Sequence, residues 1–319
     1  MSSDRRRGGV VLSLNPAVDV EWRLERVLPE EKNEIAGETR WPGGKGINVA
    51  RWLGWLDFPA RVFLPLGGDT GRELARGLRA EKIRFIRWPM SGSNRCNVVV
   101  SPSNGPQFRF NATWPRLSSC EATGLRKAAC LWATRADPVV ISGTLAFGAP
   151  AGTYADIVRT ATRAGRRVFL DCDRKPFALA ARQRPFLVKP NEFELSQWAG
   201  RPLQGDREII EAAQALSRET HGWVLVSRGA LGAILVHDRE EFVLHAAAPK
   251  VEVRNTVGAG DALLAAVVES SGRTADPADW LLSGVAAGTL ATQVPPGRLP
   301  AAGMWPKMKA RIRVRRMRA

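Results

Sequence analysis

Short apolar runs rich in Val, Ile and Leu alternate along the chain with segments of helical periodicity, and this alternation constrains the fold most. The runs include VVISG at 139–143 and WVLVSRG at 223–229, and several of them end in Gly, Asp or Asn. Helix-like segments such as TYADIVRTATRAG lie between them. Strands that alternate with helices of this length form βαβ units, so the pattern predicts an α/β fold with a mainly parallel central sheet. Ligands of such sheets bind beyond the carboxyl ends of the strands.

Two regions depart from this rhythm. Residues 17–42 and 94–112 contain short alternating stretches joined by turns, with no helical segment beside them. This pattern predicts a small β-sheet that projects from the main body as a lid. Because unpaired strand edges seek a partner, such a sheet also favours a homodimer formed through the lid.

Composition predicts an ordinary globular protein with a sizeable core, since 45% of the 319 residues are hydrophobic and 24% are charged. No apolar run has the length of a membrane span, and the first residues resemble a strand more than a signal peptide. The four cysteines form no CxxC pair, and the three histidines lack metal-ligand spacing. We therefore expect a cytoplasmic protein with neither a disulfide framework nor a zinc site.

The chain is strongly basic, with a formal net charge of +16. Its last residues, KMKARIRVRRMRA, contain seven Lys or Arg and no acid. Such charge can indicate binding to nucleic acid, but no nucleic-acid-binding motif accompanies it. We therefore interpret residues 305–319 as a disordered, solvated tail without an assigned role, and the basic body as one that handles anionic substrates.

The stretch RNTVGAGDALLAAVV at 254–268 places an acid behind a turn that has almost no side chains. Gly258, Ala259 and Gly260 would expose the first N–H groups of a helix, where a phosphate can bind. Asp261 at the same place suits a general base that accepts a proton from a hydroxyl attacking that phosphate. The alternative is an Asp that merely caps the helix. The stretch matches neither the dinucleotide-binding GxGxxG motif nor a P-loop.

A second glycine turn, WPGGKGINVARWLGWL at 41–56, also opens a helix. Lys45 lies inside this turn and Asn48 lies in the first helical turn. Both side chains suit a polyhydroxylated ligand, whereas a turn that served only the fold would not need the lysine.

The segments GGKGINVAR and NTVGAGDALLAA closely resemble the two signatures of the ribokinase-like (PfkB) carbohydrate kinases. Further segments resemble the branch that includes 1-phosphofructokinase and tagatose-6-phosphate kinase, in the order LSLNPAVD, LGGDTG, VVISGTLAFG, LVKPNEFEL and LVSRGALGAILV. The resemblance runs from about residue 10 to about residue 298. It implies a ribokinase-like, Rossmann-type kinase domain over residues 9–304, with the sugar bound between the main body and the lid.

The resemblance also implies a role for each matching residue. Asp261 matches the catalytic base, and Gly258–Gly260 match the anion hole for the transferring phosphoryl group. The residues that match sugar-binding positions are Asp19, Gly43, Gly44 and Asn48. The residues assigned to the nucleotide are Lys189, Asn191, Glu194, Ser227, Gly229 and Gly232. Asn191 and Glu194 match the pair that organises Mg²⁺ and the phosphates of ATP, partly through water.

Three cations bear on the identity of the acceptor. Lys32 and Arg95 match residues with which phosphosugar-using relatives bind phosphate, and Lys45 adds to this cluster; the alternative is that they are ordinary surface charges. Together the cations favour a sugar phosphate over a free sugar or nucleoside. Our first choice is fructose 1-phosphate, converted to fructose 1,6-bisphosphate, and tagatose 6-phosphate or fructose 6-phosphate comes next. A kinase of an unphosphorylated sugar or nucleoside, or a non-catalytic binding protein, remains as an alternative. The segments SGTLAFG and DCDRKPF depart from the branch and leave the acceptor open.

Overall fold

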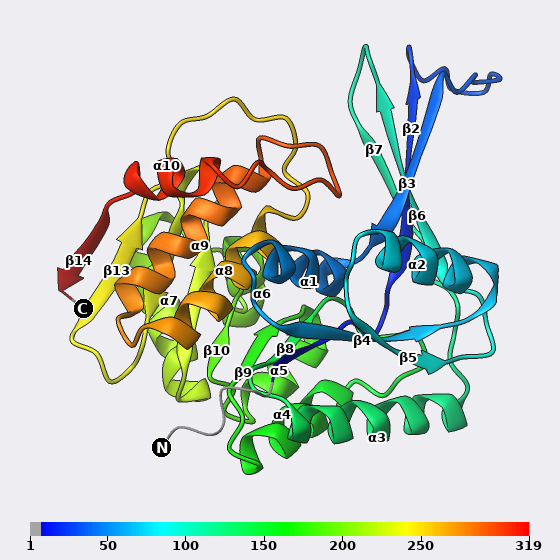
Figure 1. Ribbon diagram of the computed structural model, residues 1–319. Coiled ribbons are helices and arrows are strands. Elements are labelled where there is room, and N and C mark those ends of the chain that lie inside the picture. The colour runs from blue at the N-terminus through cyan, green and yellow to red at the C-terminus, as the bar shows by residue number, and fades with distance from the viewer. Residues whose placement is uncertain (1–7, 319) are drawn as a thin grey trace.

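The computed structural model describes residues 8–318, and the largest unit within them is a ten-stranded sheet (Figure 1). The strand order is β14-β13-β12-β11-β10-β9-β8-β1-β4-β5. Neighbouring strands from β11 to β5 are parallel, whereas β12, β13 and β14 add an antiparallel edge. The predicted α/β class with a mainly parallel sheet is confirmed. The bounds are β1 Gly9–Leu12, β4 Ala60–Leu66, β5 Phe85–Pro89, β8 Val139–Ser142, β9 Val168–Asp171, β10 Leu187–Val188, β11 Trp223–Ser227, β12 Ala233–Val236, β13 Phe242–Ala246 and β14 Val314–Arg318.

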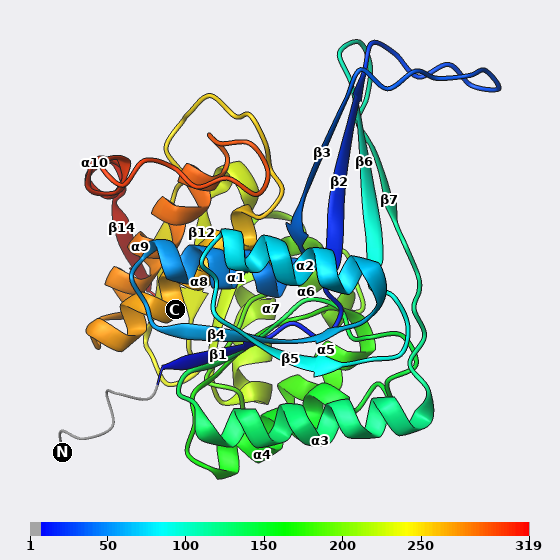
Figure 2. The ribbon, with the colours of Figure 1, turned by 45° about the vertical axis from the view of Figure 1, so that its right-hand side comes forward.

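Helices cover both faces of this sheet (Figures 1 and 2). Val10 and Leu12 of β1 join the core on one face and Val11 joins the core on the other, so the strands are apolar on both sides. Helices α1, α2, α8, α9 and α10 pack on the Val11 face, and α3 to α7 pack on the other. The bounds are α1 Lys45–Trp55, α2 Gly68–Ala80, α3 Ser119–Arg135, α4 Thr153–Arg163, α5 Arg174–Ala181, α6 Glu192–Ala199, α7 Gly205–Thr220, α8 Ala259–Arg273, α9 Pro277–Ala291 and α10 Met304–Ala310. Within residues 8–318, none of them is long and apolar enough to cross a membrane.

Helix α8 is buried on nearly every side. It packs between α1 and α9, and the residues from Ala262 to Val268 are all apolar and all buried. This explains why the run after Asp261 lacks the polar face of a surface helix. The start of α8 is therefore anchored by a buried helix that runs through the core.

Within residues 8–318, the regions 17–42 and 94–112 form a separate four-stranded sheet that projects from the main body (Figure 2). Strand β2 pairs antiparallel with β3 and parallel with β6, and β6 pairs antiparallel with β7. The predicted small sheet is thus confirmed. The beginnings of β2 and β6 and the end of β3 lie together at its base. The bounds are β2 Ala17–Leu24, β3 Gly37–Gly43, β6 Arg95–Pro102 and β7 Phe108–Asn111.

The basic C-terminal segment differs from the disordered tail that we expected. Residue 319 lies outside the described residues, but the rest of the segment forms α10 and β14, and β14 pairs with β13. Met308 and Ile312 are buried, and the rings of Trp305 and Trp55 meet edge to face with centroids 5.7 Å apart. The expectation was wrong because apolar side chains spaced among the cations dock this segment onto the sheet and α9.

Candidate active site

The predicted site residues gather where the carboxyl ends of the parallel strands meet the base of the small sheet. Asp171 ends β9, Lys189 follows β10, and Ser227 ends β11. The beginnings of α1 and α8 lie at the same edge, since Lys45 contacts Asp171 and Asn48 contacts Asp261. This is where an open parallel sheet is expected to bind ligands.

Asp261 is the third residue of α8 and is 5% exposed. Asn48 Nδ2 donates a hydrogen bond to Asp261 Oδ2 over 2.8 Å. The N-cap of α8 is Gly258, with a φ of 82° that favours glycine, and no described side chain caps this helix. The alternative reading of Asp261 as the helix cap is therefore wrong. The first N–H groups of α8 keep no side-chain partner in the described chain and can bind an anion.

The environment of Asp261 suits proton transfer. Burial and the neighbouring Asp171 carboxylate raise the pKa of Asp261 to about 6, although the hydrogen bond from Asn48 and the charges of Lys45 and Lys189 lower it. A carboxyl group with a pKa in this range is ionised at neutral pH and still basic enough to accept a proton from a reacting hydroxyl.

Asp171 carries a fully buried carboxylate between two lysines. Lys45 Nζ lies 3.2 Å from Asp171 Oδ1 and 3.6 Å from Glu194 Oε1, and Lys189 Nζ lies 3.3 Å from Asp171 Oδ2. Burial favours a raised pKa for Asp171, but the charges of Lys189 and Lys45 outweigh it and hold the pKa below its ordinary value. Lys45 thus pairs with these two acids, although we had grouped it with the cations expected to bind an acceptor phosphate.

Asp19 lies in β2 at the base of the small sheet, next to the glycine turn that precedes α1. Asn97 Nδ2 donates a hydrogen bond to Asp19 Oδ1 over 2.9 Å. Burial raises the pKa of Asp19, while Asn97 and the charge of Arg95 oppose the rise. A side chain at Gly43 would collide with the Asp19 carboxylate, so the turn wraps closely around it. Gly44, the N-cap of α1, completes this turn.

Arg95 begins β6 and reaches toward the same region. One of its Nη atoms donates to the carbonyl oxygen of Asn15 over 3.1 Å, and its Nε is buried without a hydrogen-bond partner among the described residues. A buried donor without a partner is costly, so an acceptor atom of a ligand would be favoured there. Arg95 and Asp19 together offer a ligand one cation and one carboxylate that can accept hydrogen bonds from hydroxyl groups.

The residues assigned to the nucleotide surround the beginning of α6. Asn191 caps this helix by accepting from the Glu194 N–H over 2.8 Å, and Glu194 Oε2 accepts from the Asn191 N–H over 2.9 Å. Ser227 lies beside Asn191 in a β-bridge. Gly229 begins the short helix that follows β11, and Gly232 follows it. Asn191 and Glu194 therefore build a capping box through Glu194 Oε2, while Glu194 Oε1 pairs with Lys45 at the site.

The acidic side chains near the site bear on a magnesium ion. Within residues 8–318, no three His, Cys, Asp or Glu side chains gather into a metal-binding group. Asp171 and Glu194 are close, but both pair with lysine. This donor set fits an ion that keeps most of its waters and binds mainly through nucleotide phosphates, as magnesium commonly does.

Within one chain, Lys32 lies apart from the other predicted site residues. It lies in the loop between β2 and β3, at the far end of the small sheet (Figures 1 and 2). Its side chain is 87% exposed, and its Nζ lies 3.8 Å from Glu34 Oε1.

Three residues of the site were missed in the sequence. Asp171 had a signal, because an acid that ends a strand faces the ligand edge of a parallel sheet. Asn97 had none, since its contact with Asp19 joins positions 78 apart and depends on the pairing of β2 with β6. Arg51, which donates to Asn48 over 2.7 Å, looks in the sequence like an ordinary helix cation.

Known proteins resemble this chain over almost its full length. The family model described as pfkB family carbohydrate kinase matches residues 14–301. Phosphofructokinase-2 from Escherichia coli, solved with fructose-6-phosphate, is 28% identical, with a TM-score of 0.85 over 95% of this chain and 98% of that one.

Two further structures share the fold at lower identity. A possible 1-phosphofructokinase from Thermotoga maritima is 24% identical, with a TM-score of 0.85 over 97% and 99% of the two chains. Ribokinase from Arabidopsis thaliana, solved with ribose and ATP, is 21% identical, with a TM-score of 0.76 over 95% and 98%. Since the family model spans most of the sequence and the fold agrees, this chain belongs to the PfkB family of carbohydrate kinases and is a sugar or sugar-phosphate kinase.

Proposed function

We propose that this kinase transfers the γ-phosphoryl group of ATP to a hydroxyl of a fructose phosphate and forms fructose 1,6-bisphosphate. The observation that carries the proposal is the buried Asp261 carboxylate, held by Asn48 beside the uncapped beginning of α8. Kinases of this family use ATP as their co-substrate.

The chemistry follows from two features, the Asp261 carboxylate and the N–H groups at the beginning of α8. Asp261 Oδ2 accepts a hydrogen bond from Asn48, which leaves Asp261 Oδ1 to accept the proton of the attacking hydroxyl. The hydroxyl oxygen forms the new bond to phosphorus, the bond between phosphorus and the β–γ bridging oxygen breaks, and ADP leaves. The free N–H groups over Gly258–Gly260 stabilise the charge on the transferring group. Lys189 supports them, because its Nζ is 3.5 Å from the position a Cβ on Gly260 would take.

The remaining nucleotide residues hold ATP at the strand ends. Ser227, Gly229 and Gly232 bind its phosphates and ribose side, next to the α6 capping box. Asn191 and Glu194 would hold magnesium through water, and the bound ion would supply positive charge to the phosphates.

Arg95 and Asp19 select the acceptor. Arg95 binds its existing phosphate, while Asp19, Gly43 and Gly44 bind its hydroxyls under the small sheet, which acts as a lid and excludes water. Fructose 1-phosphate is our first acceptor, from the resemblance of LSLNPAVD to the 1-phosphofructokinase branch. Fructose 6-phosphate is the second, because the Escherichia coli enzyme that is 28% identical was solved with it. Both would give the same bisphosphate.

Lys32 joins this site only in an assembly. Within one chain it is distant from Arg95, whereas a dimer formed through the lids could place it over the partner's acceptor. Phe108 and Phe110 of β7, at the edge of the small sheet, are 38% and 58% exposed, which supports an interface there.

An ADP-release assay over a panel of acceptors tests the proposal. The panel contains fructose 1-phosphate, fructose 6-phosphate, tagatose 6-phosphate, free fructose, ribose and adenosine, each with magnesium and ATP. We expect turnover on a fructose phosphate and at least about 100-fold less on the unphosphorylated compounds, as expected when buried donors lose their partner. Turnover confined to a free sugar or nucleoside, or absent on every compound with folded protein, would overturn it.

A further inference from the structure

Arg51, in the second turn of α1, lies directly behind the pair formed by Asn48 and Asp261. It is 5% exposed, and its guanidinium contacts three different groups. Nε and Nη2 bind Glu81 over 2.6 and 3.2 Å, Nη2 also binds the Pro42 carbonyl oxygen over 2.7 Å, and Nη1 binds Asn48 Oδ1 over 2.7 Å. All three guanidinium nitrogens are therefore in use within the protein.

The donor-only character of Arg51 determines how the Asn48 amide is turned. An arginine can only donate, so the Asn48 atom that faces it must be the amide oxygen. The Asn48 NH₂ group must then point the other way, toward Asp261 Oδ2. An ionised carboxylate only accepts hydrogen bonds, so this orientation matches the form of Asp261 that can act as a base. Without Arg51 the amide could rotate by half a turn and present its oxygen to the carboxylate.

We propose that Arg51 is a positioning residue, which fixes the Asn48 amide so that it supports the ionised form of the base Asp261. The proposal rests on the proposed function of Asp261 as the base. Arg51 touches neither the acceptor nor ATP in this scheme and acts only through Asn48 and the turn before α1.

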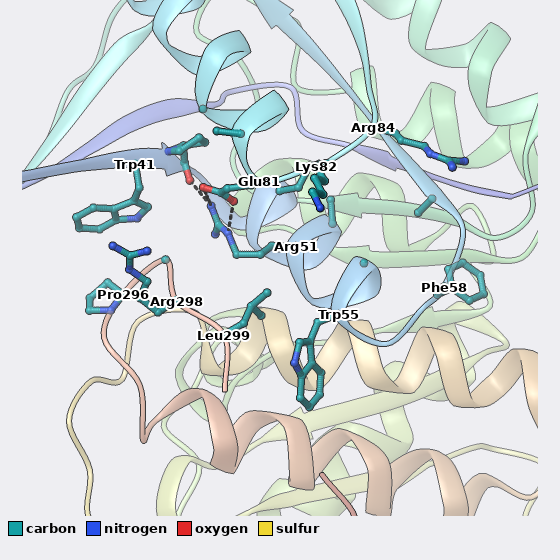
Figure 3. Close-up of a pocket in the computed structure, with 18 of the residues that line it drawn as sticks. Trp41, Arg51, Trp55, Phe58, Glu81, Lys82, Arg84, Pro296, Arg298 and Leu299 are labelled. Carbon is teal, nitrogen blue, oxygen red and sulfur yellow. Dashed lines mark hydrogen bonds and ion pairs between the residues drawn. The ribbon is translucent and has the colours of Figure 1, made fainter. Parts of the chain in front are cut away.

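Glu81 holds Arg51 in place. It is the C-cap of α2, and its bidentate pair with Arg51 links α2 to α1 at the wall of a cavity of about 830 Å³ (Figure 3). The side chain of Glu81, which lines this cavity, is 26% exposed, while that of Arg51 is 5% exposed. A lysine at position 51 could not replace the guanidinium, because one ammonium group cannot reach Glu81, Asn48 and Pro42 with the same geometry.

The same arginine also steadies the acceptor side. Its bond to the Pro42 carbonyl oxygen fixes the backbone just before Gly43, the glycine that wraps around Asp19. Loss of Arg51 should therefore weaken acceptor binding as well as proton transfer. Binding of ATP should be spared, since none of the nucleotide residues contacts Arg51.

The chain offers a matched control in Arg40. It lines the same cavity and forms a bidentate pair with Glu73 of α2, over 2.7 and 2.9 Å. This pair is bidentate like that of Arg51 and Glu81, but within residues 8–318 Arg40 hydrogen-bonds neither Asn48 nor any other residue of the site. Arg40 is 38% exposed and Arg51 only 5%, so Arg40→Met removes a more exposed ion pair of the same geometry without touching the amide.

The experiment compares Arg51→Met, Arg51→Lys, Glu81→Gln and Arg40→Met in one assay of kcat and KM against pH, with ATP binding and thermal unfolding measured in parallel. For Arg51→Met we expect kcat/KM for the acceptor to fall about 10- to 100-fold, part of what general-base catalysis contributes. The acid limb of kcat/KM should move to higher pH, because the Asn48 donor no longer favours ionised Asp261. Arg51→Lys should behave similarly, Glu81→Gln should shift the limb in the same direction by less, and Arg40→Met should leave both unchanged.

An unchanged acid limb in folded Arg51→Met, or the same shift in Arg40→Met, would overturn the positioning role. If Arg51→Met does not fold, the limb of Glu81→Gln decides instead, since this substitution keeps the size of the side chain. Asp261→Asn separates this inference from the proposed function. If Asp261→Asn keeps its activity, the proposed base is wrong; if it is inactive while the Arg51 variants match wild type, only the present inference fails.

Discussion

Replacing the buried Asp171 with Asn should weaken the fold while making Asp261 more acidic. The carboxylate of Asp171 is fully buried, and it lies 3.2 Å from Lys45 Nζ and 3.3 Å from Lys189 Nζ. Asn keeps the shape but removes the charge, so Lys189, 5% exposed, loses its buried counter-charge. Lys45 is 39% exposed and partly screened by water, so we take the lower end of the cost of breaking a buried pair, about 3 kcal/mol. With an unfolding entropy of about 2.1 cal/mol/K per residue, this loss lowers the Tm of the 319-residue chain by about 4–5 °C.

The loss should depend on pH with a defined sign. The folded-state pKa of Asp171 lies below its ordinary value of 3.8, because the lysines favour its ionised form. The stability that this charge contributes is therefore fully present at neutral pH and is lost as the pH falls through the folded-state pKa. The difference in stability between wild type and Asp171→Asn should shrink in acid.

The same substitution should also change the pH dependence of catalysis, because Asp171 influences the pKa of Asp261. Asp171 is, after burial, the main cause that raises the pKa of Asp261 to about 6. Without that charge the pKa of Asp261 falls, and the acid limb of kcat/KM moves to lower pH.

Calorimetry and a pH–rate profile of Asp171→Asn measure both effects. Asp156→Asn serves as the control, because Asp156 on α4 is 28% exposed and pairs with Arg126 away from the site. An exposed pair of this kind contributes up to about 1 kcal/mol, and the control should leave the pH profile unchanged. A Tm equal to that of the control, or an acid limb that moves to higher pH, would refute the electrostatic account of the site.

Three further predictions concern the base, the acceptor and the C-terminal segment. In wild type, kcat/KM should rise with pH through about 6 and then level off, because Asp261 must be ionised to accept a proton; a profile that stays flat down to pH 4.5 contradicts this. Arg95→Met should raise KM for the phosphosugar at least about 10-fold and leave KM for ATP unchanged, since one charge-assisted contact is lost; equal effects on both substrates contradict it. The arginines of β14 should resist brief trypsin digestion monitored by mass spectrometry, because they lie in a paired strand; immediate trimming at these residues would indicate a disordered tail.

The sequence predicts the fold of this chain well because its local signals and its global pattern agree. Alternating apolar runs and amphipathic helices indicated the parallel sheet, and the two regions without helices indicated the small sheet. The C-terminal segment shows the limit of charge as a signal. Its cations suggested disorder, whereas Met308 and Ile312 among them are enough to dock it.

The site was predictable only where one short motif contains the chemistry. Asn48 and Asp261 each follow a glycine turn that begins a helix, α1 and α8 respectively. The structure brings the two side chains together. The partners of these motifs come from distant strands. Asp171 meets Lys45 across 126 positions, and no spacing rule indicates which strand end will face which helix. Arg51 and Asn97 were missed for the same reason, since only the packed fold gives them their contacts.

The most direct test of the account is the turnover of Asp261→Asn on the acceptor that proves active, with ATP and acceptor binding measured on the same protein. Asn keeps the size of the side chain but cannot accept the proton, so kcat should fall about 100- to 10,000-fold while both substrates still bind. Turnover close to that of wild type, with both substrates bound, would contradict the claim that the carboxylate at the beginning of α8 is the base.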